Sequence, residues 1–451
     1  MQPKDVKLTR RAFLAGSLAA AGLAALAACA PKQPTEAPKK AEATATPKKE
    51  EATPAPKEPV TIVFHDRAGA HCDWHKSRLD LFHQTYPGVK LQIDEIPGDH
   101  IAKQYALAAS GTIGDVVWCY NNGTVEAVRK GVPRPLNDII EARNFDTSVY
   151  WKEMLACFTV EGKLYGIPNH GHYGTNVYYY NEDLFKAAGV PLPNPDWTVD
   201  DLVNAAKKIT KAPEVWGVRT NGAGGEHVPQ YLRTFGGNVM NAEGTKCLLD
   251  SEGSKAAIKW LYDLKYTHKV DPCICADQTR DNFVAGKVGM YNWTPGYVAE
   301  FSRIKEWTFK WGCMIAPKGP NGERGTQSSG AAFCVTKASK HPNEAFNVLE
   351  FYCSKEDGIE HVWGGAGSPG TRNDVWESER LNEFNPIYKI IRTTHPDGPA
   401  PYYFPKNGRV SECITTVDNN LQAIWTGKLG LEEGIAQLQK AVQEILDREP
   451  L

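Results

Sequence analysis

Apolar runs alternate with amphipathic stretches through the first part of the folded region. The run VTIVF at 60–64 predicts a buried strand, and helical spacing over 73–86 predicts a helix after it. The alternating segment VKLQIDEI at 89–96 predicts a second strand, a helix is expected over 99–109, and DVVWCY at 115–120 predicts a third strand. This order of strands and helices indicates a parallel sheet covered by helices, which is an α/β fold.

The pattern continues towards the C-terminus. Thr198 precedes two acidic residues and an apolar-periodic stretch, so we expect it to cap a helix. Further helices are expected over 227–235, 251–268, 341–354, 411–426 and 431–447, two strands around a Pro/Gly loop over 311–336, and a flexible crossing over 364–372. Residues 60–451 number 392 and show no internal repeat. One hydrophobic core rarely organises a chain of that length, so we expect two lobes.

The N-terminus has a pattern of its own. Arg10 and Arg11 precede 16 residues, mostly Ala, Gly and Leu, at 12–27, and Leu26-Ala27-Ala28-Cys29 follows. A membrane-spanning helix needs about 20 strongly apolar residues, so this stretch is too short for a typical one. An uncleaved N-terminal membrane anchor stays an alternative. Residues 1–29 resemble a twin-arginine export signal joined to a bacterial lipobox. The resemblance implies that Cys29 is diacylated, becomes the mature N-terminus, and holds the protein on the extracytoplasmic face of the cytoplasmic membrane, at the cell surface or in the periplasm.

A tether follows this signal. Residues 30–59 contain seven Pro, six Lys and five Glu, and no Val, Ile, Leu or aromatic residue. Such a segment cannot bury apolar surface, so we expect it to be disordered, with at most about 100 Å of reach. The functional interpretation is a leash between the membrane and the folded region. The alternative is a terminal tail without a role.

Charge and cysteine content argue against a nucleic-acid-binding protein and against a zinc protein. Residues 60–451 carry 41 Lys and Arg against 47 Asp and Glu, a net charge of −6, which argues against a nucleic-acid partner. Ten cysteines follow Cys29 with irregular spacing and no paired Cys-x-x-Cys motifs, so we expect few disulfides and no zinc site. Cys334 and Cys353 lie in apolar runs and are expected to be small buried hydrophobes.

Several segments, taken in order, point to one family. They are GDVVW at 114–118, YGIP and YYYNEDLF within 165–185, FVAGKVGMYNW at 283–293, IAPKGPNG at 315–322 and TKASKHPNEAFNVLEFYCSKE at 336–356. In this order and spacing they resemble the family 1 extracellular solute-binding proteins of ABC importers, the relatives of maltose-binding protein. The resemblance covers essentially all of residues 60–451.

The resemblance implies a two-lobed periplasmic-binding-protein fold. Each lobe is expected to hold a mixed, mostly parallel sheet flanked by helices, and crossing strands are expected to join the lobes. The first lobe would comprise residues 60–173 and 314–370, and the second residues 174–313 and 371–451. The implied function is binding of a mono- or oligosaccharide in the cleft and delivery to ABC permease subunits, by a monomer without cofactor.

Polar residues follow two of the predicted strands. Asp66 and Arg67 come after the first strand, and Asn121 and Asn122 after the third. Ligands of open α/β sheets bind beyond the C-terminal ends of the strands, so these four are candidate ligand contacts. The resemblance adds further candidates: Tyr291, Trp293 and Tyr297 as stacking aromatics, His172 and Tyr173 before the first crossing, Ser329 before a returning strand, and Arg372 after the last crossing. Trp118 and Trp363 are expected in the core.

One cluster departs from the family pattern. His71 and His75 are four residues apart, with Cys72 and Asp73 between them, so a helix would place both imidazoles on one face. Polar lining of a sugar site explains the cluster more simply, and we predict no metal. The chain has no GxSxG, HExxH or Gly-rich phosphate loop, so we expect no enzyme. The alternatives are the same fold with a glycerol phosphate ester, polyol or metal as cargo, or a secreted hydrolase.

Overall fold

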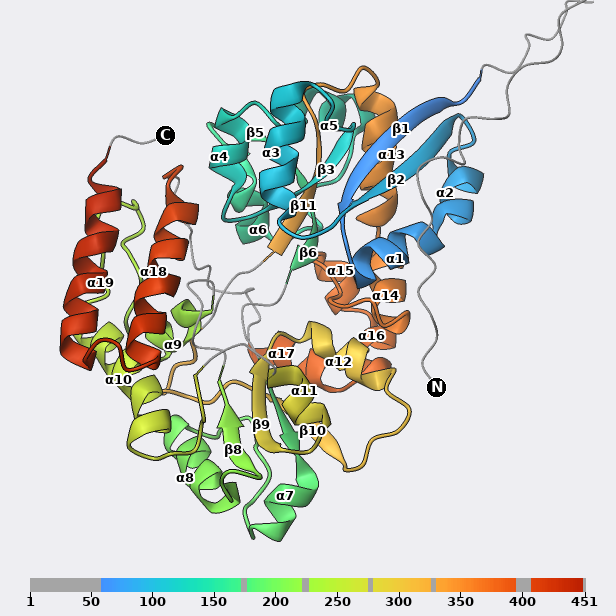
Figure 1. Cartoon of the computed structure of the whole chain (residues 1–451). Helices are drawn as coiled ribbons and strands as arrows, with labels where there is room; N and C mark the ends of the chain where they lie inside the picture. Colours follow the sequence, from blue (N-terminus) through green and yellow to red (C-terminus); the bar gives the residue numbers. More distant parts are fainter. Residues whose placement is uncertain are drawn as a thin grey trace, which may run out of the picture. The chain divides into compact units, whose positions relative to one another are not determined.

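The computed structural model describes residues 58–171, 177–220, 227–274, 279–325, 330–394 and 407–448. His172, Tyr173, Ser329 and Cys29 therefore lie outside the described residues, as do the signal and tether. Residues Lys57–Leu451 form one compact unit. Its strands fall into two main sheets, which can be followed in Figure 1.

The first sheet has five strands in the order β2-β1-β3-β11-β6. Its first three strands are parallel neighbours, as predicted, whereas β11 runs antiparallel to both β3 and β6. The elements of this part are β1 (Val60–Arg67), α1 (Ala70–Ser77), α2 (Leu79–Thr85), β2 (Val89–Ile96), α3 (His100–Ser110), β3 (Val116–Tyr120), α4 (Thr124–Arg129), α5 (Asn137–Arg143), α6 (Lys152–Cys157), β6 (Ile167–Gly171), β11 (Gly330–Val335), α13 (Pro342–Tyr352) and α14 (Lys355–Trp363). A small hairpin, β4 (Thr159–Val160) and β5 (Lys163–Leu164), completes it.

The predicted helix over 73–86 is two helices in the structure. Arg78 separates α1 from α2 with φ −100° and ψ 2°, outside helical geometry, and its N–H bonds to the His75 carbonyl three residues back. The bend lets both segments pack on the same sheet. Phe82 of α2 is fully buried, and Tyr352 of α13 donates to the His75 carbonyl at 2.7 Å.

The second sheet has four strands in the order β10-β7-β9-β8. Its strands are β7 (Val177–Asn181), β8 (Trp216–Arg219), β9 (Val288–Trp293) and β10 (Trp311–Ile315), and its helices are α7 (Glu182–Ala187), α8 (Val199–Ile209), α9 (Val228–Thr234), α10 (Glu252–Tyr266), α11 (Thr279–Val284) and α12 (Gly296–Ser302). Met314 and Ile315 pair with Tyr178 and Val177 in this sheet. Residues 314 and 315, which the sequence analysis assigns to the first lobe, therefore pair within the second sheet.

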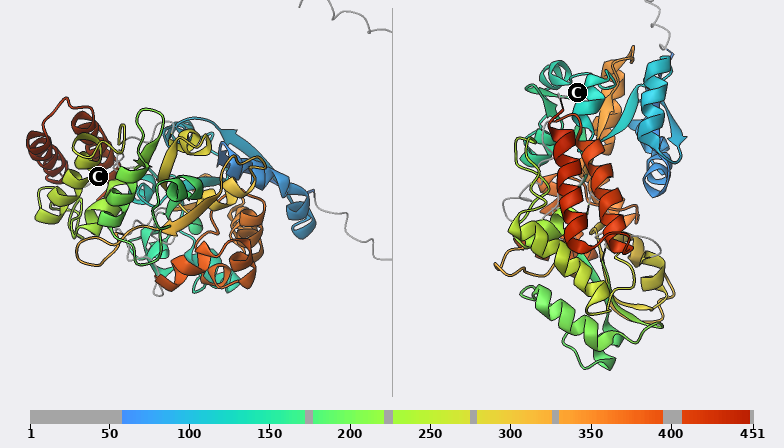
Figure 2. Two further views of the ribbon diagram at one scale, coloured as in Figure 1. Left: turned by 90° about the horizontal axis from the view of Figure 1, so that it is seen from below. Right: turned by 60° about the vertical axis from the view of Figure 1, so that its left-hand side comes forward.

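The helices of the second sheet begin and pack largely as the sequence predicts. Thr198 caps α8, and its hydroxyl and N–H form a reciprocal capping box with Asp201. Near the C-terminus, α18 (Val410–Trp425) and α19 (Leu431–Leu446) lie side by side, as Figures 1 and 2 show. Side chains of Lys265 and Tyr266 on α10 donate to the Trp425 carbonyl, which ties this helical pair to the second sheet's helices.

Two chain connections join matching edges of the two sheets. The chain runs from Gly171 to Val177 and, later, from Ile315 to Gly330. Gly171 pairs with Gly330 in the first sheet, and Val177 pairs with Ile315 in the second. Only five residues separate Gly171 from Val177, so their Cα atoms lie within about 22 Å. A third connection runs from α14 through Gly364–Thr371 to three short helices, α15 (Asn373–Trp376), α16 (Glu379–Phe384) and α17 (Ile387–Thr394).

The burial of particular cysteines and tryptophans was also predicted from the sequence. Cys334 and Cys353 are buried, as predicted, and eight cysteines of the described part are free thiols; Cys273 is disulfide-bonded. Trp118 is fully buried, as expected, but the prediction for Trp363 is wrong. Trp363 is 42% exposed, because its ring lies on Phe384 and Arg380 at the surface of α14 rather than in the core.

Candidate functional site

The C-terminal ends of β1, β3 and β6 lie along one edge of the first sheet. Strand pairing sets His65 opposite Val117, Ala331 opposite Tyr120, and Gly330 opposite Gly171. Arg67, Tyr120 and Gly171, the last residues of these three strands, therefore share that edge. This is where ligands of open α/β sheets bind.

Asp66 does not face this edge. Its side chain is fully buried, its Oδ2 lies 2.7 Å from His75 Nδ1, and its Oδ1 accepts the N–H of Arg67 at 2.8 Å. A carboxylate with these internal partners holds α1 against β1 and has no open face for a ligand. Ligand contact at Asp66 stays a prediction, which these internal bonds do not favour.

Arg67 does face this edge. Its Nη1 donates to the Tyr120 hydroxyl at 2.7 Å, and its guanidinium carbon lies 5.7 Å from the centroid of the Trp118 ring. None of the described carboxylates lies within 4 Å of it. A guanidinium has five N–H donors, so Arg67 keeps donors for a ligand.

The two asparagines after β3 have different surroundings. Asn121 is 7% exposed, its N–H bonds to the Gly330 carbonyl at 3.0 Å, and its Oδ1 accepts from the Gly330 N–H at 3.4 Å. These bonds tie the end of β3 to the start of β11, and ligand contact at Asn121 stays a prediction. Asn122 is half-buried and lines a cavity, where it stays a candidate contact.

That cavity has a volume of about 300 Å³ and lies against β3, α3, α4 and α18. Asn122, Tyr120 and Gln104 line it on one side, and Ser411, Ile414 and Thr415 of α18 on the other. Gln104 is 2% exposed and its Nε2 has no hydrogen-bond partner. Because an unpaired buried donor is costly, this amide is poised for a ligand or water.

The sequence did not single out Gln104 or its neighbour His100, although both are polar and four residues apart at the start of α3. Burial and the charge of Arg67 together lower the pKa of His100 to about 4, with smaller raising effects of Asp99 and Asp66. The ring of His100 packs edge-on against Tyr120 at 5.3 Å. The i, i+4 spacing of these two polar residues at the start of α3 was the available signal.

A histidine cluster lies next to Trp118. The rings of His71 and His361 stack at 5.1 Å, and His170 packs edge-on against His71 at 4.9 Å. His71 Nδ1 and His361 Nε2 are 3.1 Å apart, a hydrogen bond, so these two nitrogens share a proton rather than facing a common metal. Within the described ranges, no set of three or more His, Cys, Asp or Glu side chains is arranged to hold a metal ion.

The second sheet presents an aromatic group where β9 ends. Tyr291 is 2% exposed, and Trp293 stacks on it at 6.2 Å with ring planes 17° apart. Trp293 also packs against Tyr297 and His227, at 5.6 and 5.1 Å, and remains half-buried. The turn predicted at Thr294 is present, because β9 ends at Trp293 and α12 begins at Gly296.

These three predicted aromatics therefore have unequal roles. Tyr291 is buried and supports Trp293 from behind, and its direct contact with ligand stays a prediction. Tyr297 is half-buried, and the guanidinium carbon of Arg280 lies 5.8 Å from the centroid of its ring. Trp293 presents an indole that is braced from behind, and it pairs with Val177 at the start of β7. Val177 follows the first connection, so Trp293 lies on the edge linked to Gly171 of the first sheet.

Arg372 has internal partners. It forms an ion pair with Asp374 at 2.8 Å and donates to the Tyr150 hydroxyl and the Cys353 carbonyl, each at 3.4 Å. Its charge is thus already compensated where the third connection ends. These bonds fix the connection, and ligand contact at Arg372 stays a prediction.

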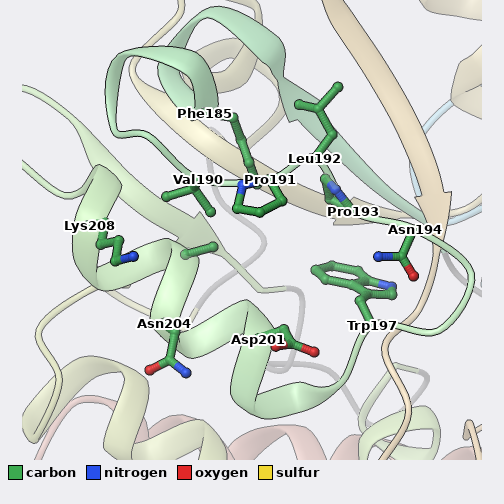
Figure 3. Close-up of a pocket in the computed structure, with 11 residues that line it drawn as sticks. Phe185, Val190, Pro191, Leu192, Pro193, Asn194, Trp197, Asp201, Asn204 and Lys208 are labelled. Atoms are coloured by element: carbon green, nitrogen blue, oxygen red, sulfur yellow. The ribbon is translucent and has the colours of Figure 1, made fainter.

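A second cavity, of about 290 Å³, lies between the α7–α8 loop and α8 (Figure 3). Its lining is mainly apolar, with Phe185, Leu192 and Trp197, and it contains none of the predicted contacts. Asp201 at its rim is engaged in the capping box of α8. Asn194, Asn204 and Lys208 add polar groups to the lining.

The fold and these linked edges define a two-lobed solute receptor. A model of the family described as bacterial extracellular solute-binding protein matches residues 73–359, more than half of the chain. The protein belongs to this family. Its members are receptors, and the family places the protein outside the cytoplasm. None of the described helices has the length and apolar character needed to cross a membrane.

The chain is similar to several characterised proteins. The arabinooligosaccharide-binding protein of Bacillus subtilis is 25% identical over 333 residues, 70% of this chain and 74% of the relative. Among solved structures, the substrate-binding protein Lmo0181 of Listeria monocytogenes with cycloalternan has a TM-score of 0.76 and 21% identity, covering 87% of this chain and all of that one.

Two other solved structures extend the comparison. Maltose-bound MalE3 of T. maritima has a TM-score of 0.74 and 23% identity, over 86% of this chain and all of that one. UgpB of Mycobacterium tuberculosis with glycerophosphocholine has a TM-score of 0.74 and 17% identity, over 87% and 99%. At these identities the structures show the two-lobed fold.

Proposed function

We propose that this protein is a receptor that binds a mono- or oligosaccharide between its two lobes and delivers it to the permease subunits of an ABC transporter. The braced, half-buried Trp293 carries this proposal. A sugar ring has C–H groups on its faces and hydroxyls on its rim. The aromatic face of Trp293 buries the C–H groups, and the N–H donors of Arg67 and Asn122 pair with the hydroxyls.

The relatives support a carbohydrate ligand. The similar proteins named above include an arabinooligosaccharide-binding protein and structures with cycloalternan and maltose. Binding alone, without chemistry, is sufficient for a receptor, because the ligand selects the closed arrangement of the lobes by differential affinity. The receptor is proposed to act as a monomer without a cofactor.

A phosphate ester is the second candidate ligand. Arg67 has no acidic partner among the described residues, and an uncompensated guanidinium suits an anion. The similarity to a protein solved with glycerophosphocholine favours the same alternative. A polyol would use the same hydroxyl contacts as a sugar.

A lipid anchor at Cys29 is proposed to keep the receptor near its permease. The support is the sequence pattern of residues 1–29 and the length and composition of residues 30–59. One diacylated cysteine supplies two acyl chains, which is enough for stable attachment. The tether would let the receptor turn and approach the permease.

The ligand class is tested by thermal unfolding against a panel of ligands. We expect one or more of arabinotriose, maltotriose and mannotriose to raise the melting temperature, because a ligand that binds only the folded state stabilises it by mass action. Glycerophosphocholine, sn-glycerol 3-phosphate and zinc chloride form the other arms. A shift with a phosphate ester and with no sugar would replace the first proposal by the second.

A further inference from the structure

The histidine cluster beside Trp118 contains a hydrogen-bonded chain with a defined direction. His361 Nδ1 lies 2.9 Å from the backbone carbonyl of Ser368, and His361 Nε2 lies 3.1 Å from His71 Nδ1. Ser368 is in the third connection, His361 is in α14, and His71 is in the first turn of α1. The chain thus joins three segments that are far apart in sequence.

The positions of the protons follow from the acceptor at one end. A carbonyl oxygen can only accept, so His361 Nδ1 carries the hydrogen. A neutral His361 then has a bare Nε2, which accepts from His71 Nδ1–H. If His71 is also neutral, its remaining nitrogen, Nε2, is a bare acceptor.

The surroundings keep both imidazoles neutral. Burial and the charge of His75 together lower the pKa of His361 to about 3, against a smaller raising effect of its bond to the Ser368 carbonyl. Burial also lowers the pKa of His71 well below 6.5, with further lowering by His170, His361, Arg67 and His75, which face it from β6, α14, β1 and α1. At neutral pH the tautomer of His71 is therefore fixed by its partner.

His71 Nε2 is left for an external partner. No described group bonds to it, and the His71 side chain is half-buried rather than enclosed. Gly367 lies beside the ring, and a Cβ there would stand 3.0 Å from His71 Cε1 and 3.7 Å from Nε2. The absence of a side chain at residue 367 keeps this edge of the imidazole uncovered.

We infer that His71 Nε2 accepts a hydrogen bond from a hydroxyl group of the ligand, and that His361 and the Ser368 carbonyl position it by fixing its tautomer. This inference rests on the proposed function, because it assigns a contact within the same site. It names the ligand class more closely as a neutral hydroxyl donor. A fully ionised phosphate or carboxylate group has no proton to donate, so the contact falls on a hydroxyl of the ligand.

The chain also explains how this edge can recognise hydroxyl donors without a free carboxylate at β1. Asp66, the acidic residue near the end of β1, is buried and bonded to His75. Arg67, on the same edge, can only donate. A hydroxyl group both donates and accepts hydrogen bonds. His71 Nε2 as acceptor and Arg67 as donor therefore suit it together.

The tautomer is tested without any ligand. We expect ¹⁵N NMR of the histidine-labelled protein at pH 7 to show His71 and His361 both protonated at Nδ1, with signals assigned by comparison with the His71→Gln and His361→Gln variants. In His361→Gln, whose amide can donate as well as accept, His71 is expected to populate both tautomers. Finding His71 protonated at Nε2 in the wild type would overturn the inference.

The contact is tested by calorimetric titration with arabinotriose and maltotriose. His71→Ala is expected to weaken binding about tenfold, because it leaves a buried ligand hydroxyl without an acceptor. The control is His341→Ala, an exposed histidine before α13 with no side-chain bond, which should leave affinity unchanged. Unchanged affinity in a folded His71→Ala protein overturns the contact alone. If neither trisaccharide, nor any other sugar, binds the wild type, the proposed function fails and this inference with it.

Discussion

Replacing Trp293 by alanine will weaken sugar binding by tenfold or more, equivalent to about 1–3 kcal/mol. The indole is half-buried at the end of β9 and supported by Tyr291, Tyr297 and His227. It would stack on a sugar face, so its fluorescence should change on binding. Calorimetric titration and fluorescence of the same variant measure both quantities.

The stability of the empty protein separates binding from core packing. Truncating a buried tryptophan costs about 3–5 kcal/mol, whereas Trp293→Ala should leave the melting temperature of the ligand-free protein almost unchanged. Trp363→Ala is a matched control, because Trp363 is exposed on α14 and should affect neither property. A large loss of stability with unaltered affinity would remove Trp293 from the site.

Replacing Cys29 by serine will abolish lipid attachment, an all-or-none effect. Serine has no thiol to acylate, so the protein should stay unprocessed or be released from the membrane. Arg10→Lys with Arg11→Lys should instead block export, since the arginine pair is the recognition element that the sequence resembles. Metabolic labelling with a fatty-acid analogue reports the modification, and label that persists in the Cys29→Ser protein would refute the anchor.

The first three strands, β1, β2 and β3, were predictable because each is a short apolar or alternating run between turn signals. β2 has the predicted bounds, and β1 and β3 differ by only a few residues. The break at Arg78 was not predictable, because apolar spacing continues through it and tertiary packing decides where the helix bends. The position of Ile315 in the second sheet depends on pairing with Val177, a long-range contact that local pattern does not contain.

The site was predictable in outline and not in detail. The rule that ligands bind at strand ends selected Arg67 and Asn122. The same rule selected Asp66, whose carboxylate is buried and bonded to His75. Polarity in a sequence does not distinguish a ligand contact from an internal hydrogen bond. Arg372 shows the same limit, because Asp374 two residues later already compensates its charge.

The hydrogen-bonded histidine chain could not be predicted from local sequence patterns. His71 was noticed with His75 as an i, i+4 pair, but its partner in the structure is His361, 290 residues away. The pair suggested a metal, whereas the fold turns His75 towards Asp66 and His71 towards His361. Only the packing of α14 against α1 reveals that the two imidazoles form a directed hydrogen bond.

Closure around the ligand tests the central claim most directly. The connections at Gly171–Val177 and Ile315–Gly330 link two sheets that should move as rigid bodies about a hinge. Small-angle X-ray scattering of residues 58–451 with a saturating sugar from the thermal panel should give a smaller radius of gyration than without it. An unchanged radius of gyration at full saturation would contradict binding between the lobes.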